Sequence, residues 1–260
     1  MLADHLARLK VRVRQAVTDH PALVPLFVRV RGLARRTLRV KDREFSFLCG
    51  PHEYCPTHGV DREGKYEGPF VERLVDSLVA TRNPVFFDVG GNVGFDSLVA
   101  AGFGVRDIHV FEPDPVATFY IRRNLRGVNH VLVETYVGDR ETIGRTTLDG
   151  YCGRTGAVPT HIKMDIEGHE MECLPGMEET LSRHRPTIFL EFHERIIREE
   201  LRYTESAVAD FFRRLVGLGY RLEYNGHQYE MITSPDRRYR YEWSAEPSNH
   251  VNFAVVATPT

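Results

Sequence analysis

The sequence predicts an α/β fold built on a mostly parallel sheet, and three observations support this prediction. Short apolar runs alternate with amphipathic stretches through the middle of the chain, which is the pattern of βαβ units. Two of these runs end in an acidic residue, at Asp88 and Glu112, and a glycine-rich turn follows the first. The final part of the chain instead contains short alternating runs joined by polar loops, which are typical of antiparallel strands.

The positions of the core elements follow from this alternation. Strands are predicted at 85–89, 107–112, 130–137, 161–166 and 187–192, and helices at 71–79, 93–102, 115–126, 169–183 and 204–217. Antiparallel strands are predicted at 220–224, 229–233 and 251–256. In such a sheet the fourth strand neighbours the first at the switch point, where open α/β sheets bind ligands.

The N-terminal part has a different character. Pro21 and Pro25 are predicted to end a first helix, and 28–40 reads as a strand or a second helix. Residues 44–68 read as a short β-rich segment. The chain has 260 residues, a length that suits one large domain with an appendage.

We therefore expect a basic N-terminal extension, 1–66, and a main domain, 67–260. Residues 1–41 hold ten Lys/Arg and two acids, so the rest of the chain is strongly acidic, because the net charge is −2. An apolar stripe near the N-terminus, from Leu2 to Val13, has arginines beside it. Such a basic helix can contact an anionic membrane or a phosphorylated carrier, or it can pack on the core with a solvated basic face.

Composition narrows the class of protein. A hydrophobic content of 42% and a charged content of 27% are ordinary for a globular protein. No apolar stretch reaches the length of a membrane span, and no secretory signal is recognisable. The four cysteines are irregularly spaced, which favours a reducing compartment over a disulfide framework. We therefore expect a cytoplasmic protein.

The turn after the first core strand reads D-x-G-x-x-x-G, from Asp88 to Gly94. A dinucleotide-binding loop would read G-x-G-x-x-G and would place a helix N-terminus against a pyrophosphate. An acid ahead of the glycines would repel a pyrophosphate but suits a ligand that carries an ammonium and a sulfonium. The charge pattern therefore favours S-adenosylmethionine over NAD, and a tight turn without a ligand is the alternative.

A second group of polar residues lies at the ends of the fourth and fifth strands. Asp165, Glu167 and His169 follow one strand, and Glu191 and His193 end the next. Because neighbouring parallel strands end at the same edge of the sheet, we expect these five side chains around one crevice. The alternative is that the acids cap the following helix.

Several segments resemble, in order and spacing, the FkbM family of S-adenosylmethionine-dependent methyltransferases: FDVGGNVGFDSL, VFEPDP, TTLD, HIKMDIEGHEMECLPGM and RPTIFLEFH. The similarity covers about residues 67–195 and, more loosely, the strands through Asn252-Phe253. It implies the class I methyltransferase fold, a Rossmann-like, seven-stranded, mostly parallel sheet closed by an antiparallel C-terminal hairpin, here with an N-terminal helical and β extension. It also implies methyl transfer, usually to oxygen, often on sugars or other natural-product hydroxyls.

The resemblance suggests roles for residues of these motifs. Four residues of the glycine loop are expected to shape the pocket for the methionine part of the cofactor: Asp88, Gly90, Asn92 and Gly94. Glu112 is expected to accept hydrogen bonds from both ribose hydroxyls, and Asp139 to lie near the adenine amine. Asp165 and Glu167 are expected beside the reactive methyl.

Methyl transfer to a hydroxyl calls for a base, because a sugar hydroxyl is a poor nucleophile, and His is the commonest such base. His169, just past the fourth strand, is our first candidate, His193 the second and Asp165 the third. In a metal-assisted alternative, Asp165, Glu191 and His193 bind Mg²⁺ or another divalent ion that lowers the pKa of the hydroxyl.

A separate cluster has the residue types of a zinc site. Its four members recur every third residue: Cys49, His52, Cys55 and His58. Structural zinc sites usually draw two ligand pairs from separated turns, so four ligands within ten residues are cramped. A loop near the substrate, or no role, is the preferred interpretation.

Other classes of function remain as alternatives. An NAD-dependent oxidoreductase is disfavoured by the missing glycine and by Asp88, and a non-catalytic nucleoside-binding protein by the acids at both strand ends. A nucleic-acid methyltransferase would use the same fold. The main domain is acidic, however, and lacks an Asn/Asp-Pro-Pro-aromatic segment. We expect a small-molecule or glycan acceptor, no nucleic acid, and membrane contact through the basic N-terminus as an option; the oligomeric state is open.

Overall fold

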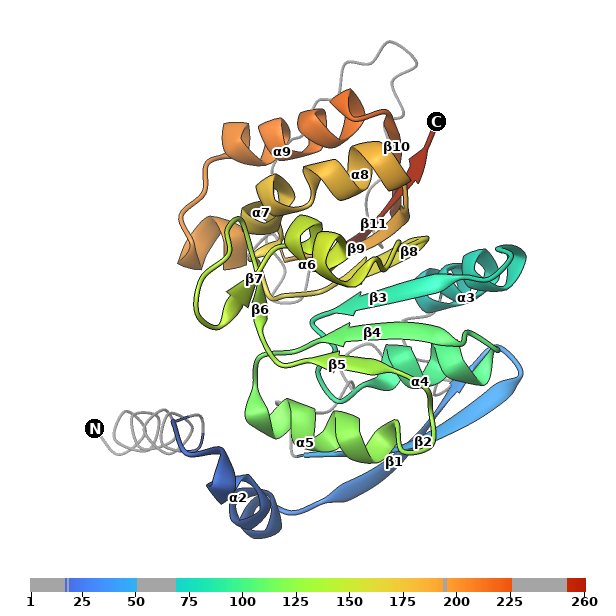
Figure 1. The fold of residues 1–260 in the computed structure, drawn as a ribbon, viewed down its shortest axis with the longest axis vertical. Helices are drawn as coiled ribbons and strands as arrows, with labels where there is room; N and C mark the ends of the chain where they lie inside the picture. The colour runs from blue at the N-terminus through green and yellow to red at the C-terminus, as the bar shows by residue number, and fades with distance from the viewer. Residues whose placement is uncertain (1–16, 18, 51–68, 194–195, 226–251) are drawn as a thin grey trace.

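A seven-stranded sheet forms the centre of the protein (Figure 1). The computed structural model describes residues 17, 19–50, 69–193, 196–225 and 252–260. The strands, in spatial order, are β10 (Tyr220–Asn225), β11 (Asn252–Pro259), β9 (Thr187–His193), β8 (His161–Met164), β3 (Val85–Val89), β4 (Asp107–Phe111) and β5 (Val131–Val133). The five strands from β9 to β5 are parallel, and β11 is antiparallel to both β9 and β10. This order confirms the α/β fold with an antiparallel C-terminal pair.

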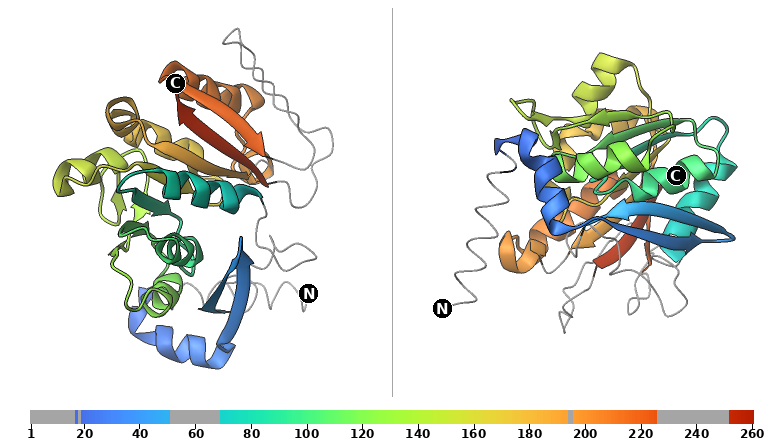
Figure 2. Two further views of the ribbon diagram at one scale, coloured as in Figure 1. Left: turned by 90° about the vertical axis from the view of Figure 1, so that its right-hand side faces the viewer. Right: turned by 90° about the horizontal axis from the view of Figure 1, so that it is seen from below.

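Helices cover both faces of this sheet, and each face has its own apolar core (Figures 1 and 2). On one face lie α3 (Pro69–Ala80), α4 (Phe95–Gly102) and α5 (Pro115–Asn124). On the other lie α6 (Leu148–Thr155), α7 (Glu170–Cys173), α8 (Glu178–His184) and α9 (Glu205–Gly217). Neighbouring residues of β3 divide between the two cores, with Phe86 in the first and Phe87 in the second. This alternation is the period of two of a strand buried on both faces.

The N-terminal part forms a short helix and a hairpin that extend the first core. A 3₁₀ turn (Pro21–Leu23) leads into α2 (Val24–Arg31), and β1 (Ala34–Val40) pairs with β2 (Arg43–Cys49). The expectation that Pro21 and Pro25 end a helix is wrong for Pro25, which lies in the first turn of α2. Proline fits there because a first-turn N–H has no partner within the helix.

Two predicted core elements are broken in the structure. The strand predicted at 130–137 stops at Val133, and β6 (Tyr136–Val137) pairs instead with β7 (Arg145–Thr146) in a separate two-stranded sheet. A turn closed by the Thr135 amide on the Val133 carbonyl, at 3.0 Å, redirects the chain. The helix predicted at 169–183 is divided into α7 and α8 by a 3₁₀ turn that contains Pro175, since proline cannot donate to a helical hydrogen bond.

Some predictions lie outside the described residues. These are the helix near the N-terminus before residue 17, most of the β-rich segment 44–68, and the strand at 229–233. The described part of the hairpin β1–β2 shares its core with α3, α4 and α5. Phe47 of this hairpin packs against Phe95 of α4, with the ring centroids 4.9 Å apart.

Candidate active site

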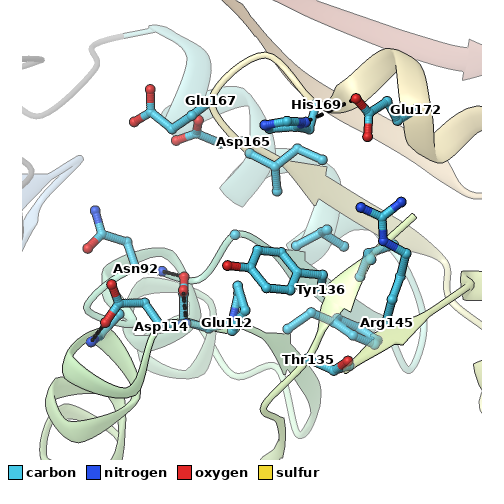
Figure 3. Close-up of a pocket in the computed structure, with 17 residues that line it drawn as sticks. Asn92, Glu112, Asp114, Thr135, Tyr136, Arg145, Asp165, Glu167, His169 and Glu172 are labelled. Carbon is cyan, nitrogen blue, oxygen red and sulfur yellow. Dashed lines mark hydrogen bonds and ion pairs between the residues drawn. The ribbon is translucent and has the colours of Figure 1, made fainter. Parts of the chain in front are cut away.

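A cavity of about 340 Å³ lies at the carboxyl ends of β3, β4 and β8. Its lining comes from four segments of the chain, within 89–92, 111–117, 135–145 and 165–172. Figure 3 shows Asn92, Glu112 and Asp114 on one side of this cavity and His169 with Glu172 on the other. Strand order explains the location of the cavity. From β3 the chain adds β4 and β5 on one side, and β8 and β9 are added on the other side. The strand order therefore reverses between β3 and β8, and open α/β sheets bind ligands at such a point.

Most of the charged residues that line the cavity are acidic. Its carboxylates are Glu112, Asp114, Asp165, Glu167 and Glu172, and the described basic residues in the lining are Arg145 and His169. This balance favours a ligand that carries positive charge. The volume lies within the range of small-molecule sites.

The glycine loop owes its sequence to close packing on the neighbouring strands. Gly90 has φ +84°, and a Cβ built on it would lie 1.8 Å from the carbonyl oxygen of Asp165. A Cβ on Gly91 would lie 2.3 Å from Cγ1 of Val110. The amides of both glycines donate to the carbonyl of Phe111. The loop is therefore held against β4 and β8, and Gly90 forms part of the cavity wall.

Two backbone hydrogen bonds fix the orientation of the Glu112 side chain. Its Oε2 accepts a hydrogen bond from the Asn92 amide at 2.8 Å, and its Oε1 accepts one from the Asp114 amide at 2.9 Å. The carboxyl group therefore links the glycine loop to the start of α5. Burial raises the pKa of Glu112 to about 7, although these two hydrogen bonds oppose that shift.

Asp88 does not line the cavity, contrary to its predicted role in cofactor binding. The side chain is fully buried below the loop, where Oδ2 accepts a hydrogen bond from the Ser97 hydroxyl at 2.5 Å. Burial raises its pKa to about 6, against the opposing effect of the Lys163 charge. Alternation along β3 explains the difference, because Val89 reaches the cavity and Asp88 points to the opposite face.

Lys163 is the centre of a buried charge cluster that the sequence analysis missed. Its Nζ lies 3.1 Å from Asp96 Oδ2, 3.4 Å from Asp165 Oδ2 and 3.9 Å from Glu191 Oε1. Burial opposes the charge on Lys163, but the surrounding carboxylates hold its pKa well above the usual value. A lysine within an otherwise apolar strand was the available signal, because buried lysines require partners.

Asp165 and His193 form an ion pair at the edge of the cavity. His193 Nε2 lies 2.8 Å from Asp165 Oδ1, and His193 Nδ1 lies 3.7 Å from Glu167 Oε2. Burial alone would lower the pKa of His193, but the hydrogen bond and charge of Asp165 raise it to about 9. Burial opposes ionisation of Asp165, yet Lys163 and His193 lower its pKa below the ordinary value. Both members are therefore charged at neutral pH.

His169 lies on the wall of the cavity just before α7. Its side chain is half exposed, and Nδ1 lies 3.3 Å from Glu172 Oε1 one turn later in the chain. Figure 3 shows the imidazole beside the Glu172 carboxylate at the cavity wall. Of the predicted candidates for the base, His169 is the only one that is not held in the Asp165–His193 pair.

The remaining predicted residues are distributed as follows. Glu167 lines the cavity with φ +55°, and Asn92 lines it through the glycine loop. Gly94 and Asp139 do not line it. Asp139 pairs with Arg140 and with Arg145 instead, and Arg145 does reach the cavity.

The structure does not bring Asp165, Glu191 and His193 together as the predicted metal-ligating set. Glu191 faces Lys163 instead. Among the described residues, Asp165, Glu170 and His193 have potential ligand atoms that all lie within 4.8 Å of one another. Glu170 Oε1 accepts hydrogen bonds from the amides of Ile166 and Gly168, so this carboxylate closes the turn after β8. Cys49 is buried at the end of β2, and the other three members of the Cys/His cluster lie outside the described residues.

One protein-family model matches the part of the chain that contains Lys163, Asp165 and Glu191. Residues 139–222 match the model of the methyltransferase FkbM domain. Over these residues the chain is similar to an FkbM methyltransferase domain. The matched residues run from the segment beside β6 through the first strand of the C-terminal pair, and they include Lys163, Asp165, His169 and His193.

Several solved structures are similar to this protein. A SAM-dependent methyltransferase from Agrobacterium tumefaciens has a TM-score of 0.52 and 13% identity, over 87% of this chain and 70% of that chain. An FkbM methyltransferase from Methylobacillus flagellatus KT has a TM-score of 0.48 and 18% identity, over 68% of this chain and 45% of that chain. A tRNA (uracil-54, C5)-methyltransferase from Pyrococcus abyssi, in complex with S-adenosyl-L-homocysteine, has a TM-score of 0.45 and 17% identity, over 86% of this chain and 43% of that chain.

The present chain thus spans less than half the length of the Methylobacillus and Pyrococcus proteins. A comparison with curated proteins gives no match. Among the described residues, no helix combines the length and apolar character that a membrane crossing requires.

The sequence analysis also missed several residues of the cavity wall. Thr135, Tyr136 and Arg145 line it from the small sheet β6–β7. Asp114 lines it from the start of α5, where its side chain also accepts hydrogen bonds from the amides of Val116 and Ala117. The available signal for Asp114 was the N-cap pattern Asp-Pro before a helix. No sequence signal indicated that β6 leaves the main sheet.

Proposed function

We propose that this protein transfers a methyl group from S-adenosylmethionine to a hydroxyl of a sugar, glycan or other natural-product acceptor. The observation that carries the proposal is the acidic cavity at the switch point, which Glu112 and Asp165 approach from different strands. A sulfonium and an ammonium are both positively charged, so an acidic wall suits this cofactor. The FkbM domain supports methyl transfer as the class of reaction.

The residues present fit the cofactor at two positions. Each carboxylate oxygen of Glu112 already accepts one backbone hydrogen bond and retains acceptor capacity for a ribose hydroxyl. Asp165, which is ionised, together with Glu167 supplies negative charge for the ammonium and sulfonium end. Asn92 and Asp114 frame Glu112 on either side. Asp139 is left out of this assignment, because it lies outside the cavity lining.

The bound cofactor would supply a methyl group on an electrophilic sulfonium. The protein must then hold the acceptor hydroxyl in line with that methyl group, an effect worth up to ~7–11 kcal/mol in favourable cases. It must also accept the hydroxyl proton as the new bond forms.

We assign the base role to His169. His193 already carries a proton at neutral pH, because Asp165 raises its pKa to about 9. Asp165 is a weak base, because Lys163 and His193 lower its pKa. His169 faces the cavity, and its contact with Glu172 orients the ring and stabilises the imidazolium that proton transfer produces.

The open part of the cavity supports the proposed acceptor class. Tyr136 is 60% exposed although it belongs to the lining, and Arg145 stands beside it in Figure 3. An exposed aromatic ring with a polar tip and a nearby guanidinium offers a face and hydrogen bonds to a sugar ring. A polyanionic nucleic acid would meet the five carboxylates of the wall, which favours a neutral acceptor.

Calorimetric titration of the purified protein tests the cofactor assignment. S-adenosylhomocysteine should bind, and NAD should give no heat of binding. The substitution Glu112→Gln should lower the affinity for S-adenosylhomocysteine. Binding of NAD alone would reject the proposal in favour of an oxidoreductase. Loss of activity after exhaustive chelation, restored by Mg²⁺, would replace the His169 mechanism with the metal-assisted one.

The acceptor assignment needs a separate experiment. Transfer of labelled methyl groups should be measured to glycans, small hydroxylated natural products and tRNA. Label in an acid-stable ether on a sugar would support the proposal. Label in tRNA alone would establish the nucleic-acid alternative.

A further inference from the structure

Helix α2 and the residue pair that follows it expose an apolar stripe. Leu23, Leu26, Val30 and Leu33 are 42%, 60%, 78% and 51% exposed. Leu23, Leu26 and Val30 belong to α2 and the turn before it. They are three and four residues apart, so their side chains lie on one face of the helix. The described residues contain nine exposed large hydrophobic side chains, and four of them fall in this segment. Such clustering distinguishes the stripe from the single exposed apolar residues that are normal on a surface.

The opposite face of α2 already supplies its packing against the protein. Val24 and Val28 are buried in the first core, and Phe27 packs partly against it. The helix therefore needs no further apolar residue for its attachment. A surface helix of a globular protein would place polar residues where Leu26 and Val30 lie. The stripe is an additional apolar surface.

Arginines border the stripe. Arg29 lies on the exposed side of α2, and Arg35 and Arg36 follow Leu33 at the start of β1, all three exposed. No ion pair joins any of these three to an acid among the described residues. The sequence between Asp19 and Asp42 holds six Lys/Arg and no acid. The segment thus combines apolar and uncompensated basic side chains on a chain whose net charge is −2.

We infer that this surface, defined by Leu23, Leu26, Val30, Leu33, Arg29, Arg35 and Arg36, docks on an anionic lipid bilayer. Apolar side chains that enter the acyl boundary, with guanidinium groups at the level of anionic headgroups, are the pattern of an interfacial helix. Nucleic acid would use the arginines but would leave the leucines in water. Lipid headgroups together with acyl chains satisfy both kinds of side chain.

The docking surface is connected to the cavity through one helix. Helix α2 packs against α5, and the N-cap of α5, Asp114, lines the cavity. In Figure 1, α2 lies on the side of the molecule toward which the carboxyl ends of β3 and β4 point. Docking of α2 would therefore bring the cavity near the bilayer. The inference stands independently of the reaction, because it rests on surface residues alone.

Vesicle flotation of the full chain tests the inference. Vesicles of phosphatidylcholine and phosphatidylglycerol in equal amounts should carry the protein, and vesicles of phosphatidylcholine alone should not. Leu26→Gln with Val30→Gln should reduce the floated fraction about tenfold or more, because each apolar contact is replaced by a hydrated amide. Arg29→Gln, Arg35→Gln and Arg36→Gln together should reduce it similarly, and added salt should reproduce that loss.

Matched variants separate location from composition. The first control, Val79→Gln with Ile143→Gln, removes two exposed apolar side chains outside the docking surface. The second control removes three positive charges, as many as the α2 arginine variant does, through Arg82→Gln, Arg106→Gln and Arg126→Gln. Both sets should float like the native protein. Equal flotation of the α2 variants and these controls would overturn the inference. Failure of the native protein to float would also overturn it, and a doubled mass in light scattering that the α2 variants lose would assign the stripe to a second copy of the chain.

Discussion

The imidazoles of His169 and His193 show how surroundings separate two residues of one type. His193 is buried against Asp165, whereas His169 is half exposed and faces the cavity. The sequence placed both near the ends of neighbouring strands but could not distinguish their surroundings. That difference comes from Asp165, which lies 28 residues away from His193 along the chain.

Replacing His169 should affect turnover and leave cofactor binding intact. We expect His169→Gln to lower kcat by about 10²–10⁴-fold, because the hydroxyl proton loses its acceptor. The affinity for S-adenosylhomocysteine should not change. Single-turnover kinetics and calorimetry measure the two quantities. His130→Gln serves as the control, since His130 contacts the Val128 carbonyl away from the cavity. Unchanged turnover in His169→Gln would discard the assignment.

The Asp165–His193 pair should make stability depend on pH. The pKa of His193 is about 9 in the folded protein, above its ordinary value of 6.5. The raised pKa of His193 therefore contributes stability that is fully present below pH 6.5 as long as Asp165 is ionised, and that is lost as the pH rises through about 9. Its size should be on the order of 1–3 kcal/mol. Denaturant unfolding across this range should show a decline in the native protein and in His184→Gln, and a flatter profile in His193→Gln. Parallel profiles would contradict the pairing.

Lys163 should be required for stability. Lys163→Met leaves Asp96, Asp165 and Glu191 without their buried cation, so we expect a loss of about 3–5 kcal/mol in the free energy of unfolding. Lys41→Met removes an exposed lysine that pairs with Asp76, and it should cost at most about 1 kcal/mol. Chemical denaturation of both variants gives the comparison. Equal losses would show that the buried cluster is not organised around Lys163.

At the scale of elements, local sequence predicted what local forces decide. Apolar runs and amphipathic stretches located β3, β4, α5 and α9 to within a few residues. The sequence did not predict the end of β5 at Val133, because a strand pattern continues beyond it. There the chain is redirected by a turn and by pairing with β7, which depends on residues further along the chain.

The glycine loop gives a prediction at this scale. Gly90 and Gly104 both have positive φ, but only a Cβ on Gly90 meets other atoms, at 1.8 Å from the Asp165 carbonyl oxygen. Gly104→Ala should cost about 1 kcal/mol through backbone strain alone. Gly90→Ala should cost about 3 kcal/mol or more, because the loop must also move away from β8. Thermal unfolding ranks the two variants. A smaller loss for Gly90→Ala would show that the loop does not rest on β8.

At the scale of the whole molecule, the two cores on either side of one sheet place residues from many segments around one cavity. Ligand binding to the folded state alone should therefore stabilise the entire domain. At one hundred times its Kd, S-adenosylhomocysteine should add about 2.7 kcal/mol to the free energy of unfolding. Glu112→Gln should lose most of this gain at the same ligand concentration.

Asp139→Asn provides the informative control for that experiment. The sequence suggested Asp139 as a neighbour of the adenine, whereas the structure pairs it with Arg140 and Arg145 outside the cavity lining. We therefore expect Asp139→Asn to respond to the ligand like the native protein. Thermal shift assays on the three proteins measure the effect. If Asp139→Asn loses as much of the ligand-induced stabilisation as Glu112→Gln does, Asp139 contributes to ligand binding.

The sequence by itself determined the class of fold and the strand ends at which polar residues gather, because apolar periodicity and glycine turns act over a few neighbouring residues. It located Glu112, Asp165, Glu167 and His169, all of which line the cavity. Only the tertiary structure decided that Asp88 points away from the cavity, that Lys163 lies among the carboxylates of Asp96, Asp165 and Glu191, and that His193 pairs with Asp165. These contacts join residues of different strands and helices, so they depend on strand order, register and burial rather than on any local pattern.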